Sequence, residues 1–168
     1  MKNLIIALFF IGLTTQVFAQ DLKTEQLSEV IVVATNYKYL SSVDSQESAI
    51  PVNLLQRKAA TYNIREADFY NDEYDYYTVS FYIPKGKIVA AYDKDGNIIR
   101  TIEKYTNIAL PKAVATSVAK RFPKWKISKD VYLLKYNNKK GAKRTYKLIL
   151  ENGDERLRIK TDADGNFL

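Results

Sequence analysis

The sequence predicts an α+β fold built from two tandem repeats, each made of one helix followed by a four-stranded antiparallel meander. One observation is a repeated motif: Asp-Lys-Asp-Gly-Asn at 93–97 occurs again, as Asp-Ala-Asp-Gly-Asn, at 162–166. The two stretches that end in these turns also begin alike, with Ile-Pro at 50–51 and Leu-Pro at 110–111. After each proline the spacing of apolar residues changes from three or four to two, as in a helix followed by strands. We expect both helices on one face of a continuous sheet and the other face open to solvent.

Residues 1–19 have the features of a secretory signal peptide. Lys2 supplies a positive charge, 4–13 is an apolar run, and Val-Phe-Ala at 17–19 offers small residues before a cleavage site between Ala19 and Gln20. The apolar run is shorter than the roughly 20 residues that a membrane-spanning helix needs. We therefore expect a periplasmic or secreted protein without a transmembrane span.

Residues 20–49 form an N-terminal arm in this interpretation. The arm contains one β-rich apolar run, Val-Ile-Val-Val at 30–33, which we expect to dock onto the body of the protein. The polar stretch 41–48 predicts a loop.

The first repeat covers 50–105. Pro51 is well placed in the first turn of a helix, and an apolar stripe follows it. Asn63 ends this helix. Strands are predicted at 66–71, 76–83, 88–93 and 98–105.

The second repeat covers 106–168. Its helix begins at Pro111 and ends before Pro123, which cannot continue a helix. A polar loop is expected at 138–143, and the Asn-Gly pair at 152–153 is typical of a hairpin turn. Strands are predicted at 131–137, 145–150 and 156–160, with a stub of a fourth at 167–168.

Several short sequences of the second repeat occur together. They are Leu-Pro-Lys-Ala-Val at 110–114, Arg-Phe-Pro-Lys-Trp at 121–125, Val-Tyr at 131–132, Tyr-Lys-Leu at 146–148 and the closing 162–168. This combination resembles the PepSY-like family of exported proteins of the Bacteroidetes type, also described as β-lactamase-inhibitor-like. The resemblance implies two helix-plus-meander repeats, export, and a non-enzymatic binding or inhibitory role. It implies no catalytic residues.

The chain has no His and no Cys, which excludes several kinds of chemistry. A Ser-His-Asp triad, a thiol nucleophile, a Cys-ligated zinc and a nucleotidyltransferase of the His-x-Gly-His type are all excluded. The Asp-x-Asp-Gly-Asn turns resemble part of a calcium loop, but in the first of them Gly96 stands at position four and Lys104 at position twelve, where an EF-hand needs Gly at six and Glu at twelve. We therefore expect structural turns, no cofactor, no metal and no enzymatic activity.

One alternative is a small envelope hydrolase or cation-dependent enzyme. It would use a cluster of carboxylates, Glu66, Asp68, Asp72, Glu73 and Asp75. Another alternative is a scaffold or chaperone-like protein that uses the apolar run at 30–33.

Charge is distributed unevenly between the repeats. Residues 106–168 contain 15 basic and 6 acidic side chains, whereas 51–105 contain 8 of each. A basic surface attracts acidic partners, so we expect an unknown protein or an anionic envelope component to bind the open sheet face; export disfavours nucleic acid. The residues expected on this candidate binding face are Tyr76, Thr78, Tyr82, Lys135, Lys147, Arg158 and Lys160.

Overall fold

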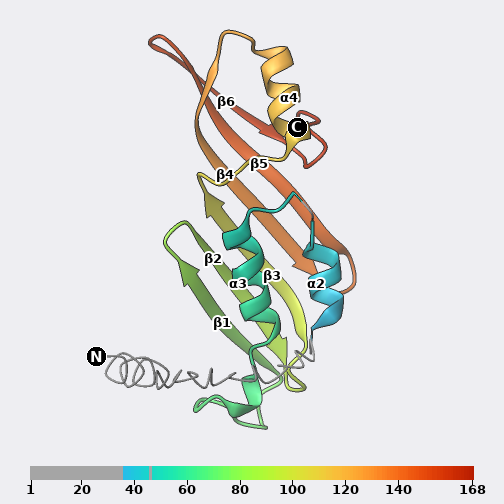
Figure 1. Cartoon of the computed structure of the whole chain (residues 1–168). Coiled ribbons are helices and arrows are strands. Elements are labelled where there is room, and N and C mark those ends of the chain that lie inside the picture. The colour runs from blue at the N-terminus through green and yellow to red at the C-terminus, as the bar shows by residue number, and fades with distance from the viewer. Residues whose placement is uncertain (1–35, 46) are drawn as a thin grey trace, which may run out of the picture. The chain divides into compact units, whose positions relative to one another are not determined.

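A computed structural model describes residues 36–45 and 47–168 (Figure 1). The expected signal peptide, its cleavage site and the apolar run at 30–33 lie outside these residues. Three α-helices and six strands make up the described chain, with one short 3₁₀ turn between α3 and β1. The helices are α2 (Tyr37–Val43), α3 (Ile50–Ala60) and α4 (Lys112–Arg121). The strands are β1 (Tyr76–Ile83), β2 (Gly86–Asp93), β3 (Ile98–Thr106), β4 (Lys126–Asn137), β5 (Gly141–Asn152) and β6 (Glu155–Thr161).

The six strands form one antiparallel sheet in chain order, β1-β2-β3-β4-β5-β6. Each strand therefore pairs with its neighbour in sequence, and β3 joins the strands of the first half to those of the second. One helix followed by three strands occurs twice, as α3-β1-β2-β3 and α4-β4-β5-β6. The α+β class is confirmed, but the prediction of four strands in each repeat is wrong.

The predicted strand at 66–71 is absent because local hydrogen bonds bend this stretch. The side chain of Asn63 accepts a hydrogen bond of 3.1 Å from the backbone N–H of Arg65, at the start of a 3₁₀ turn at Ile64–Glu66. The backbone N–H of Tyr70 then donates to the carbonyl of Ala67 in a second turn. An Asn side chain that competes for backbone donors in this way favours a turn over a strand.

The predicted stub at 167–168 forms a single bridge, between Thr161 and Phe167. Three backbone hydrogen bonds hold the connecting turn and the stub. The N–H groups of Asp162, Gly165 and Leu168 donate to the carbonyls of Asn166, Asp162 and Lys160, respectively.

The expected loop at 41–48 is also wrong in part, since helix α2 extends to Val43. Tyr39 and Val43 lie four residues apart on one face of the helix, and both are fully buried. Ser41 and Ser42 lie on the solvent side and donate to the carbonyl of Lys38. Two buried side chains at helical spacing stabilise α2 despite its polar composition.

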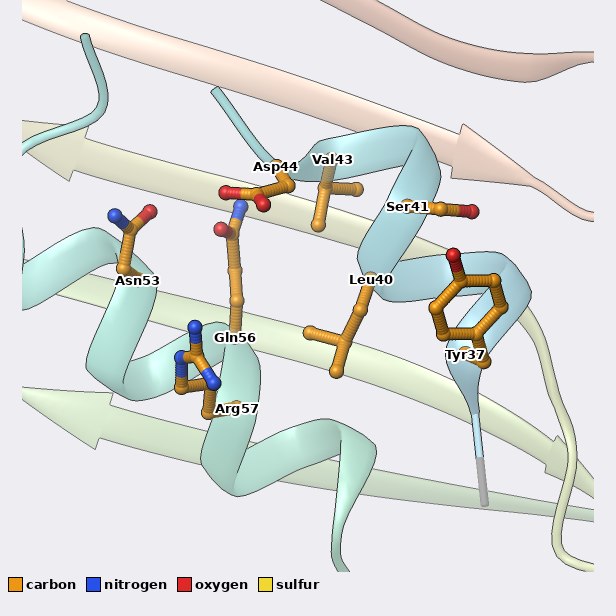
Figure 2. A pocket seen from close by; sticks show the side chains of 8 residues that line it. All are labelled: Tyr37, Leu40, Ser41, Val43, Asp44, Asn53, Gln56 and Arg57. Atoms are coloured by element: carbon orange, nitrogen blue, oxygen red, sulfur yellow. The ribbon is translucent and has the colours of Figure 1, made fainter. Parts of the chain in front are cut away.

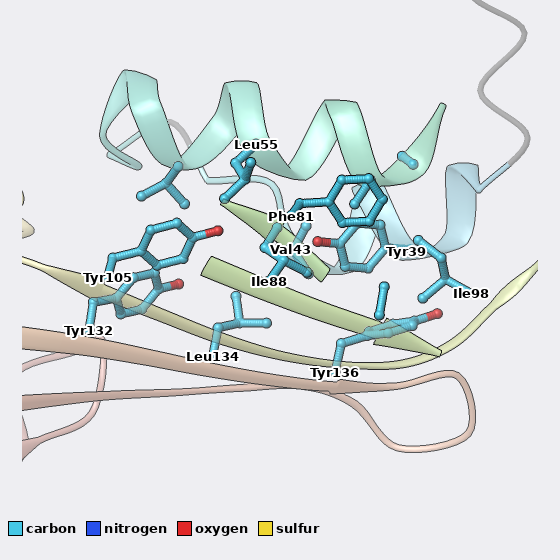
Figure 3. Packing of buried hydrophobic residues seen from close by; sticks show 14 of the residues in the cluster. Tyr39, Val43, Leu55, Phe81, Ile88, Ile98, Tyr105, Tyr132, Leu134 and Tyr136 are labelled. Carbon is cyan, nitrogen blue, oxygen red and sulfur yellow. The ribbon is translucent and has the colours of Figure 1, made fainter. Parts of the chain in front are cut away.

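The hydrophobic core lies between the sheet and the helices (Figure 3). Helix α3 contacts β1 and β2, and α2 contacts α3, β4 and β5. Helix α4 buries Val114 and Val118 in the same core. Tyrosine rings fill much of the space, with Tyr105, Tyr132 and Tyr146 stacked on adjacent strands. All three helices therefore cover one face of the sheet, and the other face has no helix on it among the described residues.

Candidate functional site

All seven residues predicted for the binding face are exposed. Pairing across the sheet places them on the face away from the helices, because side chains alternate between the two faces of each strand. They do not form one cluster. The tyrosines at the β1 edge, Tyr76 and Tyr82, lie five strand spacings from β6, or roughly 24 Å at about 4.8 Å per spacing. Lys147 and Lys160, in contrast, are directly opposite each other on β5 and β6.

The open face is hollowed over β4, β5 and β6. The hollow has a volume of about 380 Å³. Its lining residues are Lys129, Val131, Lys147, Leu148, Ile149, Arg158, Ile159 and Lys160. Val131 and Ile149 are half-buried, while the four cationic side chains of the lining are exposed. An apolar base with a cationic rim can bind an anionic group that carries an apolar part.

A β-bulge brings Lys129 to this rim. The pairing of β4 with β5 shifts between Ile127 and Lys129, so that Lys129 is opposite Ile149. Ser128 is the additional residue, and its hydroxyl donates to the carbonyl of Ile149 at 3.3 Å. The sequence pattern did not place Lys129 on this face, because the strand it predicts begins only at Val131. A bulge leaves no period-two pattern that would have revealed it.

The rim cations have no carboxylate partners in the part of the chain that the structure describes. Two ion pairs form there, Arg65 with Asp95 and Arg156 with Glu151. The second pair lies beside the rim at the β5–β6 turn, and both of its members are partly exposed, with a distance of 2.7 Å between Nη2 and Oε1. Lys129, Lys147, Arg158 and Lys160 therefore present uncompensated positive charge around the hollow.

Lys135 and Thr78 also lie on the open face but outside the hollow. Lys135 is paired with Ile102 and Lys143 in the middle of the sheet. Ile102 is 53% exposed there, so the open face has apolar area between β1 and the hollow. Further cations extend the basic character over the same face: Lys87, Arg100, Lys104 and Lys143.

The helix-covered face contains a buried acidic residue that the sequence pattern did not indicate. Glu103 is completely buried, and its two carboxylate oxygens accept four hydrogen bonds. Tyr39 and Thr101 donate to Oε1 at 2.7 and 2.9 Å. Gln56 and Tyr105 donate to Oε2, each at 2.9 Å. Loss of hydration in the core raises the pKa of Glu103, and the four hydrogen bonds oppose this shift without cancelling it.

The tyrosines of this network stay protonated donors. Burial and the negative charge of Glu103 raise the pKa of Tyr39 and the pKa of Tyr105 far above the usual range. The network joins α2, α3 and β3, and Glu103 at its centre is fully buried. We therefore assign it a structural role.

A second hollow lies between α2 and α3 (Figure 2). Its volume is about 520 Å³. The lining residues are Tyr37, Leu40, Ser41, Val43, Asp44, Asn53, Gln56 and Arg57. The lining contains one cation and one carboxylate, so it has no net charge preference. Gln56 is already bound to Glu103, which removes one polar group from the contacts that a ligand could make.

The two Asp-x-Asp-Gly-Asn sequences form closely similar turns. Oδ1 of Asp93 accepts hydrogen bonds from the backbone of Asp95 and Asn97, and Asp162 does the same in the second turn. Gly96 and Gly165 have φ angles of 85° and 83°. Aspartate, glycine and asparagine are thus all required by the turn itself.

The carboxylates of the alternative enzyme hypothesis are exposed, in the connection between α3 and β1, where Glu66 belongs to the 3₁₀ turn. Within residues 36–45 and 47–168, no group of three acidic side chains is arranged to hold a metal ion. The loop is tied to β1 by the hydroxyl of Tyr77, which donates to the carbonyl of Asn71 and accepts from its N–H.

No helix among the described residues is long and apolar enough to cross a membrane. No family model matches the chain, and neither a curated protein nor a solved structure matches it significantly.

Proposed function

We propose that this protein is an exported, non-catalytic binding module that recognises an anionic partner through the open face of its sheet. The observation that carries the proposal is the hollow over β4–β6, where the half-buried Val131 and Ile149 are surrounded by four cations without carboxylate partners among the described residues. An anion bound there gains charge attraction at the rim and apolar contact at the base. The partner is a protein or another anionic envelope component, and the proposed site of action is the periplasm or the outside of the cell.

A charge-reversal experiment tests this proposal. In the double variant Lys147→Glu/Lys160→Glu, two directly opposed rim cations become carboxylates, while β5 and β6 keep their pairing. We expect the wild-type protein to retain anionic components of a native envelope extract, and to bind polyglutamate in a salt-dependent manner. The double variant should lose at least about tenfold in polyglutamate affinity, because attraction is replaced by repulsion at contact distance.

The matched control is Lys139→Glu/Lys140→Glu, which changes the net charge equally at exposed positions in the β4–β5 turn. This control should bind almost as well as the wild type. Equal losses in the two double variants would show that only total charge matters, and the open-face site would then be withdrawn.

A further inference from the structure

Strand β6 is an edge strand whose outer backbone groups are partly free. The hairpin loop is Gly153-Asp154, so the flanking residues Asn152 and Glu155 form a hydrogen-bonded pair. Hydrogen-bonded pairs then alternate along the hairpin, which directs the backbone N–H and C=O of Arg156, Arg158 and Lys160 away from β5. The N–H of Leu168 confirms this direction, since it donates to the carbonyl of Lys160 at 3.0 Å.

The short segment 167–168 covers only one end of this edge. Phe167 bridges to Thr161, in antiparallel orientation. Beyond Leu168, the outward N–H and C=O groups of Arg156 and Arg158 have no partner among the described residues. An incoming strand in line with 167–168 would find these four groups at the spacing of an antiparallel ladder.

A third hollow, of about 380 Å³, lies along the β6 edge, next to Phe122 and Phe167. Phe122, Ile159 and Phe167 give it apolar walls, and the rings of Phe122 and Phe167 meet edge to face with centroids 5.9 Å apart. The guanidinium of Arg121 lies 4.5 Å from the centroid of the Phe167 ring. The hollow therefore combines the apolar side chains of Phe122, Ile159 and Phe167 with the cations Arg121, Arg158 and Lys160, which also line it. Arg158 and Lys160 point to the open face of β6, and Ile159 points to the helix-covered face.

We infer that β6 binds an extended peptide segment of a partner protein by strand addition, and that the segment alternates acidic and apolar side chains. The alternation follows from the sheet geometry. Side chains opposite Arg156 and Arg158 would point to the open face, where carboxylates meet the cations. The side chain opposite Ile159 would point to the hollow formed by Phe122 and Phe167. This inference rests on the proposed function and specifies its partner.

A second copy of this chain fits the edge less well. Two β6 strands paired with each other would bring the arginines and Lys160 of one copy against those of the other, and like charges across a ladder are destabilising. Cations on an edge discourage self-pairing and leave an acidic strand favoured.

The test uses a labelled seven-residue peptide that alternates glutamate and valine, with both ends blocked, and the full mature protein. Binding is measured by fluorescence anisotropy. Arg158→Ala removes the side chain but keeps the outward N–H, whereas Arg158→Pro removes both and places a ring at the edge. Proline is tolerated at such an outward position because no β5–β6 hydrogen bond is lost. We expect Arg158→Ala to weaken binding a few-fold and Arg158→Pro to weaken it at least about tenfold further.

A peptide with N-methyl groups at alternate residues provides a test that does not depend on the folding of a variant. It keeps charge and shape but cannot complete the ladder, so its affinity for the wild-type protein should fall at least about tenfold. A block peptide of the same composition, with the glutamates together, should also bind weakly. Leu157→Pro tests whether the outward direction is assigned to the right residues. It removes the backbone hydrogen bond from Leu157 to Leu150, so it should lower the midpoint of thermal unfolding clearly more than Arg158→Pro does.

Equal binding of the methylated and unmethylated peptides would overturn strand addition. So would equal affinities of Arg158→Pro and Arg158→Ala, or dimerisation of the wild type through β6 in sedimentation measurements. If Lys147→Glu/Lys160→Glu abolishes polyanion binding while these ladder tests fail, the open-face proposal stands and only the strand-addition inference falls.

Discussion

The hydroxyl of Tyr39 donates a hydrogen bond of 2.7 Å to Oε1 of Glu103, 64 positions later in the chain. This contact joins α2, a helix of seven residues, to strand β3 in the middle of the sheet. Such a helix is too short to be stable alone. Its position therefore depends on the buried rings and polar network beneath it, which also hold α3 through Gln56.

Replacement of Tyr39 by Phe should destabilise the protein by about 1–3 kcal/mol, the cost of leaving a buried carboxyl oxygen without a hydrogen-bond partner. The ring stays, so packing against Tyr136 is retained. Urea unfolding followed by far-UV circular dichroism measures the change. Tyr37→Phe is the matched control on the same helix, since Tyr37 is 74% exposed, and it should alter the free energy of unfolding by less than about 0.5 kcal/mol. Equal effects of the two substitutions would contradict a special role for the Tyr39 hydroxyl.

The stability of the protein should depend on pH through Glu103. Its pKa is raised above the ordinary value of 4.5 by burial, so the folded state binds this proton more tightly than the unfolded state does. The contribution of Glu103 to the free energy of unfolding is therefore greatest below pH 4.5 and falls as the pH rises through the folded pKa. Glu103→Gln removes this titration. The difference in unfolding free energy, wild type minus variant, should decrease from pH 4 to pH 8; a difference that stays level or increases would refute the assignment.

Export predicts a defined mature N-terminus. A protein recovered from the periplasm or the medium should begin at Gln20, because small residues at 17 and 19 precede the cleavage site. N-terminal sequencing or intact-mass measurement shows the result. Ala19→Asp should block cleavage and leave the longer chain associated with cells. An uncleaved wild-type chain in the cytoplasm would remove the export part of the proposed function.

Local sequence patterns predicted some of the regular elements. The strand expected at 76–83 has the same bounds as β1, and the two helices after Pro51 and Pro111 are found at α3 and α4. These elements are specified by residues close together in sequence, namely an apolar period, a proline at the start and turn residues at the end. The wrong prediction at 66–71 also has a local cause. The backbone N–H of Arg65 donates a hydrogen bond to the side chain of Asn63, and this contact favours a turn over the weak strand pattern.

Glu103 shows why the core network escaped prediction. On β3, the pairing with β2 shifts so that Ala91 is opposite Arg100 and Tyr92 is opposite Ile98, which leaves Ile99 as an extra residue. This irregularity reverses the alternation along the strand. Glu103 consequently faces the core, while its neighbour Ile102 faces solvent. A reading based on hydrophobicity alone would favour the opposite arrangement.

The sequence by itself determined the α+β class, the succession of a helix and then strands in each half, the paired turns, the concentration of positive charge after residue 106, and the absence of imidazole and thiol chemistry. Each follows from composition or from neighbouring residues. Only the tertiary structure decided that α2 exists, that Glu103 is buried, that Lys129 joins the open-face hollow, and that β6 has a free edge. These features depend on strand register and on contacts between residues far apart in the chain, because burial and pairing are properties of the packed sheet.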